Sequence, residues 1–495
     1  MVPAWVLLKR KIYFEHDASA PGGAGGAGEE SMGGASAGAG ASGKESIGGA
    51  SAGGAGGSGG ATAGGATAGG AGGSGGIVSR VQFRQEITDT ILHYLRSLKP
   101  DARFANPPEL SALRLLRPTE SIPRPTGGIT SAFVASADKN LVALYAGPYR
   151  PGTHLKGGYL IYDASKNSLS AIPKPPFHYS HAKLGLGAIV VAEEDTYRLC
   201  ELNKLRDSDP HEAELCTWLP SSQQWTVEVA RFPPELSPPN YYFHADMCFS
   251  YNRTILCWVD LFKGMVICDS VLRIDGRLQF RFIPFHPECV TYDRRGQSSE
   301  RPRQGEDFRS IACVGGSIKF VTMDGYGQRP GHEVSLTIWT LSSDLSGWNK
   351  GQEYHLRDIW ASEAYRSLGL SETVPSFPVL SMDKGDVVCL VVTHWDVTAD
   401  SKVVVFNGQH LLSVDMQHKK VSIIPTNTGQ LHSQLFASEC SAYLQRLEDH
   451  QGKFKARKVG ESGKRWCFEI FASCHVSKFG PRVSHVFVSH NVQLI

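Results

Sequence analysis

The sequence lacks both a large net charge and a long apolar run. Its 50 lysines and arginines balance 48 aspartates and glutamates, so the formal net charge is only +2. Such a surface has no global field that would attract nucleic acid or anionic lipid. One of the longest uncharged apolar runs, Val387–Trp395, is far too short to span a bilayer. We therefore expect neither nucleic acid nor a membrane as a partner.

The N-terminal residues also lack the charge order of a secretion signal, because Met1–Leu8 precedes the basic run Lys9–Lys11 instead of following one. The 11 cysteines include no C-x-x-C pair, and most lie inside apolar runs, as Cys257 and Cys389 do. An odd number of cysteines embedded in strands indicates reduced thiols that act as small apolar side chains. These features predict a cytoplasmic or nuclear protein.

No motif identifies a reaction. The sequence has no serine in a nucleophile elbow, no H-E-x-x-H and no P-loop. The G-x-G-x-x-G matches lie in a Gly-rich stretch that no strand precedes and no helix follows. We therefore assign no catalytic, cofactor-binding or metal-binding residue, and we expect no cofactor and a non-enzymatic role.

What the sequence does contain is a repeated strand pattern. In residues 240–287, four short apolar runs are separated by turn residues, which is typical of an up-and-down antiparallel sheet. One such sheet cannot bury enough apolar surface alone, so it needs similar neighbours. From Ile129 onwards the chain supplies five such units. Their opening halves begin at Ser131, Gly187, Ala245, Ser310 and Phe377. Their closing halves are Tyr159–Pro173, Cys216–Pro233, Met265–Pro284, Leu336–Leu356 and His410–Pro425.

The pattern predicts an all-β fold, a β-propeller of about five to six four-stranded antiparallel blades with a few short helices. Trp5–Phe14 is expected to be one strand, which together with Leu110–Leu116 and later segments forms a sixth blade and closes the ring. Apolar residues at helical spacing predict helices over 87–98, Asp358–Leu370 and Gln430–Asp449.

The expected organisation follows from these elements. Residues 20–76 are almost wholly Gly, Ala and Ser and cannot repay the entropy of ordering, so they are a disordered tether. The segments are 1–19, the first strand; 20–76, the tether; 77–108, a short helix and linker; 109–428, the propeller; 429–450, a C-terminal helix; and 451–495, a tail with no assigned role.

Several stretches are similar to a known family. The opening WVLL, the segment YLIYDASKNSLSAIP, the segment ADMCFSYNRTILCWVDLFKGMVICD and the later IWTL run resemble the plant domain-of-unknown-function 1618 family. The resemblance covers Trp5–Phe14 and then Leu110 to about Leu447. The family is similar in layout to the propellers that follow F-boxes in plant ubiquitin-ligase receptors, although this chain has no F-box signature. By analogy alone, this implies binding of a protein partner.

Three cysteines could align across adjacent strands. Cys248 and Cys257 lie symmetrically about the Asn252-Arg253 turn, and Cys257 and Cys268 lie symmetrically about the Phe262-Lys263 turn. If both turns are centred there, the three thiols share one face of the sheet. They would then be either a redox or metal cluster or three small packing residues. Packing is favoured, because soft-metal sites need a fourth ligand and usually use pairs held by turns.

The best polar group consists of His178, His181, His244 and Asp246, which lie in the segments leading into the second and third repeats. Loops at equivalent positions meet at one end of a propeller channel. A His/Asp group there could ligate a metal or act as acid and base. The alternative is a structural hydrogen-bonding role, which is the favoured interpretation.

The sequence thus leaves three functions open. The first is a non-enzymatic module that presents loops to a protein partner. The second is a propeller hydrolase or metal-dependent enzyme that uses His178, His181, His244 and Asp246. The third is a carbohydrate-binding propeller, in which several tryptophans would form the platform, although recurring aromatics more often pack between blades.

Overall fold

The computed structural model of the chain describes residues 3–16, 89–117, 129–147, 157–175, 181–205, 211–236, 243–271, 277–289, 304–397, 404–426 and 434–443. All of them belong to one compact unit, residues 1–450. The predicted tether at 20–76 and the tail at 451–495 lie outside the described residues.

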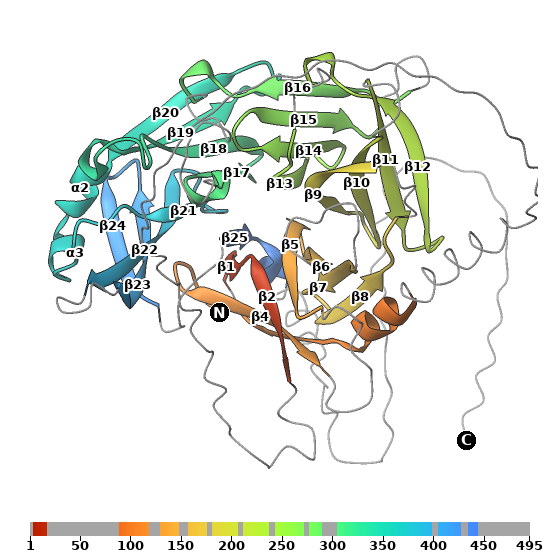
Figure 1. The fold of residues 1–495 in the computed structure, drawn as a ribbon, viewed down its shortest axis with the longest axis horizontal. Coiled ribbons are helices and arrows are strands. Elements are labelled where there is room, and N and C mark those ends of the chain that lie inside the picture. The colour runs from red at the N-terminus through yellow and green to blue at the C-terminus, as the bar shows by residue number, and fades with distance from the viewer. Residues whose placement is uncertain are drawn as a thin grey trace, which may run out of the picture. The chain divides into compact units, whose positions relative to one another are not determined.

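The predicted fold class is confirmed: the described chain is mostly β and is built from four-stranded antiparallel sheets of the propeller type (Figure 1). Five runs of four consecutive strands each pair in order. They are β5 (Ser131–Asp138), β6 (Leu141–Ala146), β7 (Gly158–Asp163) and β8 (Ser168–Ile172); β9 (His181–Ala192), β10 (Tyr197–Leu205), β11 (Glu212–Leu219) and β12 (Gln224–Arg231); β13 (Met247–Tyr251), β14 (Ile255–Asp260), β15 (Gly264–Asp269) and β16 (Phe280–Pro284); β17 (Arg309–Val314), β18 (Ser317–Asp324), β19 (Ser335–Leu341) and β20 (Trp348–His355); and β21 (Ser376–Leu380), β22 (Val387–Val397), β23 (Val404–Asp415) and β24 (Lys420–Pro425).

Turn chemistry defines these hairpins. Lys139, Asn167 and Asn252 take positive φ angles of 50°, 45° and 49° in the turns between paired strands, as tight hairpin turns require. Gly264 has a φ of 149°, and a Cβ built there would lie 2.3 Å from the carbonyl oxygen of Ile283. Only glycine fits at this start of β15.

The N-terminal stretch departs from the expected single strand. Trp5–Phe14 is split into β1 (Val6–Lys9) and β2 (Lys11–His16), so that prediction is wrong. The break falls at Arg10, where the backbone bends, and the buried guanidinium of Arg10 is held by Gln434, just before β25 (Leu435–Ser438), and by Asp246, just before β13. The two halves therefore occupy separate positions in one sheet, with β1 and β2 on opposite sides of β4 (Leu110–Arg117).

These two strands share one sheet with the last described strand. The order is β25-β1-β4-β2-β5-β6-β7-β8, with β3 (Lys99–Arg103) paired to β4 (Leu110–Arg117). β1 pairs antiparallel with β25 (Leu435–Ser438), so strands more than 400 residues apart in the sequence lie side by side. The strand at β3 was not predicted, because Lys99-Pro100 was expected to end the preceding helix and the residues after it lack an apolar alternation.

The C-terminal helix is also a wrong prediction within the described residues. Residues 434–443 contain β25 and a short 3-10 helix, η5 (Cys440–Tyr443), where an α-helix was expected over Gln430–Asp449. Hydrogen bonding to the edge of β1 outweighs the local helical spacing, which is weak evidence in so short a segment.

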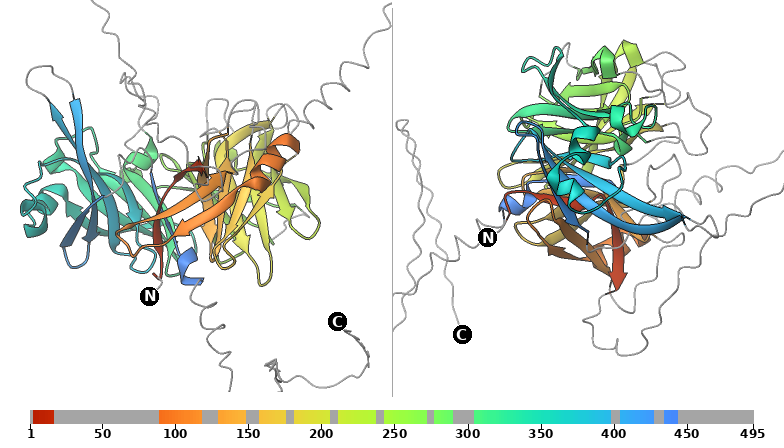
Figure 2. Two further views of the ribbon diagram at one scale, coloured as in Figure 1. Left: turned by 90° about the horizontal axis from the view of Figure 1, so that it is seen from below. Right: turned by 90° about the vertical axis from the view of Figure 1, so that its left-hand side faces the viewer.

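The other helices are short. The helix expected over 87–98 is present at residues 89–97, and the Asp358–Leu370 segment forms α2 (Leu356–Trp360) and α3 (Glu363–Arg366). Further 3-10 turns are η1 (Pro234–Leu236), η2 (Pro287–Cys289), η3 (Gly305–Asp307) and η4 (Gly331–Glu333). β22 and β23 run well past their neighbours as a long hairpin, which Figure 2 shows from two sides.

The core lies between successive sheets. Phe280 of β16 contacts Phe232, which follows β12, with ring centroids 6.2 Å apart. Phe285, which follows β16, stacks on Phe320 of β18 at 4.1 Å. Burial of each apolar sheet face against its neighbour is what stabilises strands that could not fold alone.

Two tryptophans repeat one packing role. Trp225 of β12 donates its indole N–H to the carbonyl of Pro173 at 2.8 Å, just after β8 of the preceding sheet. Trp348 of β20 donates to the carbonyl of Pro284 at 3.0 Å, the last residue of β16 of the preceding sheet. Each indole thus ties the last strand of one sheet to the end of the previous one.

Candidate ligand-binding site

The first strands of the sheets contact one another in order. β5 contacts β9 and β13, β13 contacts β17, β17 contacts β21, β21 contacts β25, and β25 contacts β5 (Figure 1). A cavity of about 150 Å³ lies among them. Its lining comes from five of these strands and the residues just after them: β5, β13, β17, β21 and β25.

The wall of the cavity is mostly apolar and rich in sulfur. Ile311, Leu380 and Leu435 line it from three different strands. Met247 and Met382 add flexible thioethers, which adapt to ligands of different shape. The arrangement is typical of ligand pockets, where apolar walls combine with a few placed polar groups.

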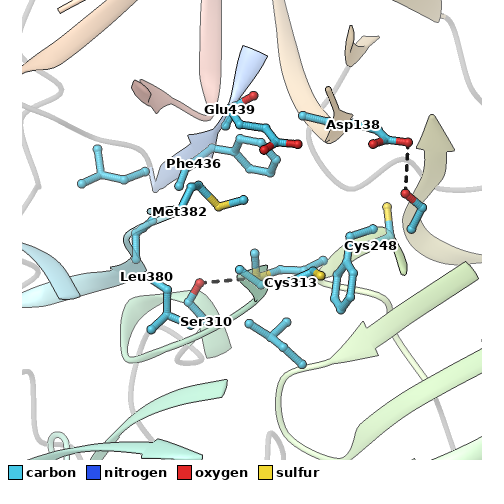
Figure 3. Close-up of a pocket in the computed structure, with 18 residues that line it drawn as sticks. Asp138, Cys248, Ser310, Cys313, Leu380, Met382, Phe436 and Glu439 are labelled. Carbon is cyan, nitrogen blue, oxygen red and sulfur yellow. Dashed lines mark hydrogen bonds between the residues drawn. The ribbon is translucent and has the colours of Figure 1, made fainter. Parts of the chain in front are cut away.

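Two carboxylates supply the charge. Asp138, the last residue of β5, accepts hydrogen bonds at Oδ2 from the backbone N–H of Ala192 at 2.8 Å and from Ser250 Oγ at 3.3 Å. Glu439 follows β25 directly and is exposed. Both residues line the cavity, and Figure 3 shows the Asp138 carboxylate turned towards the hydroxyl of its hydrogen-bond partner Ser250. The exposed Glu439 marks the side of the cavity that faces solvent.

The charge of Asp138 acts on Glu439. Partial desolvation, and then the negative charge of Asp138, raise the pKa of Glu439, while Lys139 acts in the opposite direction. The pKa of the Cys313 thiol in the same wall is raised by desolvation and by the charge of Glu439. The cavity therefore holds excess negative potential that a cationic group would relieve.

A second polar group closes off the amino ends of the same strands. We call it the Arg10 cluster: Arg10, Asp246, Glu306 and Gln434. Arg10 donates to the Gln434 side chain at 2.8 Å and to the carbonyl of Asp246 at 2.5 Å, and it lies 3.7 Å from the Glu306 carboxylate. All four are buried, so the cluster fills this end while the carboxylates of the cavity lie at the other.

The structure describes only part of the predicted His/Asp group. His178 lies outside the described residues, and His181 is described only through its backbone, which pairs with Leu205 at the start of β9. His244 Nδ1 lies 3.1 Å from Asp246 Oδ1, so these two are brought together. They precede β13, at the end opposite to the cavity carboxylates.

Asp246 is tied to the local backbone as well. Its Oδ2 accepts from the N–H of Leu261 at 3.0 Å. Asp260 accepts from the N–H groups of His244 and Phe262, each at 3.0 Å. These bonds fasten the segment before β13 to the turn between β14 and β15, which is a structural use of the carboxylates.

The predicted alignment of three cysteines is wrong. Both turns have three residues, so Phe249 opposes Cys257, and Leu256 opposes Cys268. A shift of one residue reverses the face of a strand. Cys248 and Cys268 therefore pack in one interface and Cys257 packs in the next. Burial raises the pKa of Cys248 to about 12 and that of Cys257 well above its ordinary value.

The described residues offer neither a metal-ligand group nor a membrane-spanning helix. No three His, Cys, Asp or Glu residues in this part of the chain lie close enough together to hold a metal ion. None of the described helices is long and apolar enough to cross a bilayer.

The cavity residues were not predicted from the sequence, because the candidate polar residues were those in the segments leading into the second and third repeats. Asp138 is instead the last residue of β5, and Cys313 is the second-to-last residue of β17, so both lie at the far ends of first strands. Comparing the last residues of the five opening strands would have singled out those positions. Glu439 had no such signal, because its strand was expected to be helical.

Antiparallel four-stranded sheets whose first strands gather around one cavity define a β-propeller-like protein. The predicted resemblance is confirmed over residues 258–389, from β14 to β22, where the model of the family described as "Protein of unknown function (DUF1618)" matches the chain. No curated protein matches the chain.

Three solved structures are similar to part of this chain. The WD40 domain of SCAP from fission yeast is 12% identical, with 64% of this chain and 70% of that chain covered and a TM-score of 0.28. The β-propeller domain of the Trilobed protease from Pyrococcus furiosus is 9% identical, with 59% and 70% covered and a TM-score of 0.27. The GH74 enzyme of Niastella koreensis is 12% identical, with 60% and 38% covered and a TM-score of 0.30. Likeness at this level carries no argument about activity.

Proposed function

We propose that the protein is a non-enzymatic binding module of the cytoplasm or nucleus that receives a side chain of a protein partner in the cavity. The observation that carries the proposal is the cavity itself, about 150 Å³ in volume and lined from five strands of different sheets. A site assembled this way is held by the rigid framework of the fold, which favours selective binding.

In this proposal the His244–Asp246 pair has a structural role. Both oxygens of Asp246 take part in local contacts, and Asp260 secures the same segment from β14. The tryptophans likewise serve packing, since Trp225 and Trp348 donate their indole N–H groups to the neighbouring sheet. These uses favour the binding module over a hydrolase or metal-dependent enzyme and over a carbohydrate platform.

The test is comparative proximity labelling with the full chain. Ala312 of β17 and Ala437 of β25 both line the cavity and are half-buried, so Ala312→Phe and Ala437→Phe each fill it. Thr226→Phe is the matched control, because Thr226 is exposed on the outer strand β12. Circular dichroism and thermal melting establish that each variant is folded.

We expect a reproducible set of partners that both cavity variants lose and the Thr226→Phe variant keeps. Equal labelling by all four folded proteins would overturn the proposal, because binding would then not use the cavity. Two cavity variants guard against misfolding of one, since they introduce the ring from different strands.

A further inference from the structure

We infer that the cavity receives an apolar side chain of phenylalanine size, which the partner inserts ring first, and that basic residues flank this side chain in the partner. The inference rests on the proposed function and deepens it by naming the chemistry of the partner. It is carried by the order of apolar and charged groups along the first strands of the sheets.

The deep end of the cavity is apolar. Met247 and Leu435, the first residues of β13 and β25, line the cavity at the strand ends next to the Arg10 cluster. Met247, Val379 and Leu435 also line a smaller void that borders Arg10 itself. The part of an occupant that reaches furthest from solvent therefore meets thioether and aliphatic groups.

Two polar groups in the deeper wall already have partners. Ser310 donates to the thioether sulfur of Met247 at 3.9 Å. The Cys248 thiol donates to the carbonyls of Ala135 and Ala188 at 3.4 and 3.3 Å. An apolar occupant leaves these bonds intact, whereas a polar tip would lose its hydration without gaining a bond from these groups.

The volume matches one aromatic ring. The cavity measures about 150 Å³, and an engineered apolar cavity of ~150 Å³ takes one benzene molecule. Leu380, Met382 and Phe436 contribute aliphatic, thioether and aromatic surface to the wall (Figure 3). Thioethers and aromatic rings both make favourable contacts with an inserted ring. A phenyl ring thus fills the space, whereas the methyl group of alanine leaves most of it empty.

Charged groups gather at the mouth instead. Asp138 ends β5 and Glu439 follows β25, so both lie at the strand ends away from the Arg10 cluster. The turns after the first strands frame the same end, and the turn after β9 begins next to Ala192, whose N–H donates to Asp138. Seven acids and three bases occur in the residues that frame this end: 138–140, 193–196, 252–254, 315–316, 381–386 and 439.

Neighbouring strands neutralise two of these acids. The guanidinium of Arg198 lies 3.6 Å from Glu193, and the ammonium of Lys319 lies 3.1 Å from Asp386. An excess of negative charge remains, and it favours a basic partner surface. Because the Arg10 cluster closes the other end, an occupant enters from the mouth. Its ring then points to the apolar end, and the residues on either side of it in the partner lie against the acidic rim.

The experiment uses the peptide Ac-Lys-Phe-Lys-NH2 as the probe. Its binding to the full chain is measured by saturation-transfer NMR titration, alongside Ac-Lys-Ala-Lys-NH2, Ac-Lys-Leu-Lys-NH2 and Ac-Glu-Phe-Glu-NH2. Ala312→Phe and Ala437→Phe fill the cavity from β17 and β25, and Thr226→Phe on the outer strand β12 is the control. Circular dichroism establishes that each variant is folded.

A second pair of variants tests the rim. Glu194→Gln/Asp195→Asn/Glu439→Gln removes three exposed charges near the mouth and leaves the hydrogen bonds of Asp138 in place. The matched control, Asp358→Asn/Glu363→Gln/Glu372→Gln, removes the same three kinds of charge from exposed positions in and after α2 and α3.

We expect wild type to bind Ac-Lys-Phe-Lys-NH2 at least about tenfold more tightly than the alanine peptide, as burial of the ring predicts. The leucine peptide should lie between them, and the ring protons should receive the most saturation. Both cavity variants should lose the preference for phenylalanine over alanine, and Thr226→Phe should keep it. The rim variant should bind the lysine peptides about threefold more weakly or less still, with the preference retained, and its control should be unchanged.

Equal binding of the phenylalanine and alanine peptides, or a preference that survives in both cavity variants, would overturn the inference. Tighter binding of the leucine peptide would also overturn the assignment of a ring. Tighter binding of Ac-Glu-Phe-Glu-NH2 than of Ac-Lys-Phe-Lys-NH2 would overturn the basic flanks.

The two proposals fail separately. Ring-dependent peptide binding without any protein partner that depends on the cavity would keep the inferred chemistry and remove the proposed function. A partner lost in Ala312→Phe, together with a cavity that does not distinguish phenylalanine from alanine, would keep the function and remove the inferred ring.

Discussion

Replacing Arg10 by methionine should destabilise the whole β unit. Arg10 is 3% exposed and lies at the break between β1 and β2. Its guanidinium donates to the carbonyls of Val134 and Asp246 and to the Gln434 side chain, so one residue holds groups from β5, β13 and β25. Methionine fills similar volume but has no donor and no charge.

The cost can be worked out from the contacts. Glu306 is 4% exposed and lies 3.7 Å from Arg10, so the substitution removes an ion-pair partner of a buried carboxylate. Breaking a buried pair from one side costs about 3–5 kcal/mol. Whole domains are stable by only about 5–15 kcal/mol, so this one change removes a large fraction of the stability.

The assay is urea unfolding followed by both tryptophan fluorescence and far-ultraviolet circular dichroism. With an m value of about 3 kcal/mol/M, the loss lowers the urea midpoint by about 1–1.7 M. Adding Glu306→Gln should recover part of the loss, because the buried carboxylate that lost its ion pair with Arg10 is then replaced by a neutral amide. Lys350→Met is the matched control: its ion pair with Glu353, at 3.3 Å, is exposed and contributes less than about 1 kcal/mol.

Two results would refute the reasoning. One is a free energy of unfolding for Arg10→Met within about 1 kcal/mol of wild type. The other is an effect of Glu306→Gln that is the same with and without Arg10, because the two groups would then be uncoupled.

Three further predictions concern single sites. Gly264→Ala should lower the free energy of unfolding by at least about 3 kcal/mol in urea melts, because a φ of 149° is strained for alanine and the added Cβ would meet backbone atoms. Gly347→Ala, with open space around the added Cβ, should be near neutral. Equal costs for the two substitutions would contradict the account. Among the nine described cysteines, only Cys313 is not fully buried. Iodoacetamide under native conditions should therefore modify Cys313 before the other eight, as read by peptide mass spectrometry, and the reaction should be slow because the pKa of its thiol is raised. Modification of Cys257 before Cys313 would be inconsistent with the burial of Cys257. The raised pKa of Glu439 means that its carboxylate is less favourable in the folded state than in the unfolded chain, a cost that is present at neutral pH and is lost as the pH falls through the folded pKa. Glu439→Gln should therefore raise the melting temperature at neutral pH and lose that advantage in mild acid. A difference in melting temperature that stays constant at every pH would contradict this prediction.

The repeats could be predicted because each carries its own local signals. Alternating apolar residues and turns such as Lys139-Asn140 set strand and hairpin positions without reference to the rest of the chain. The five four-stranded runs were predictable on that basis. The packing role of Trp225 and Trp348 followed from the same repetition, because their positions match between repeats.

What depended on distant partners could not be predicted. The break at Arg10 is set by groups more than 120 residues away, and β25 is a strand because the edge of β1 is available to it. The cysteine alignment failed for a smaller reason: a turn of three residues in place of two moves Cys257 to the opposite face.

The cavity depended on both kinds of information. Asp138 comes from a predictable strand, but Glu439 joins it only through the pairing of β25 with β1. No local pattern relates these two carboxylates, which are 301 residues apart in the sequence. A site built across sheets becomes visible only when the first strands are placed together.

The most direct test of the account uses Cys313 as a native reporter in the cavity wall. The measurement is its rate of alkylation by iodoacetamide, read by peptide mass spectrometry, with and without a saturating amount of the partner that Ala312→Phe fails to bind. A partner side chain inside the cavity should slow the reaction of Cys313 and leave the buried Cys389 unreactive in both samples. An unchanged rate for Cys313 in the saturated complex would contradict the claim that this protein binds through its cavity.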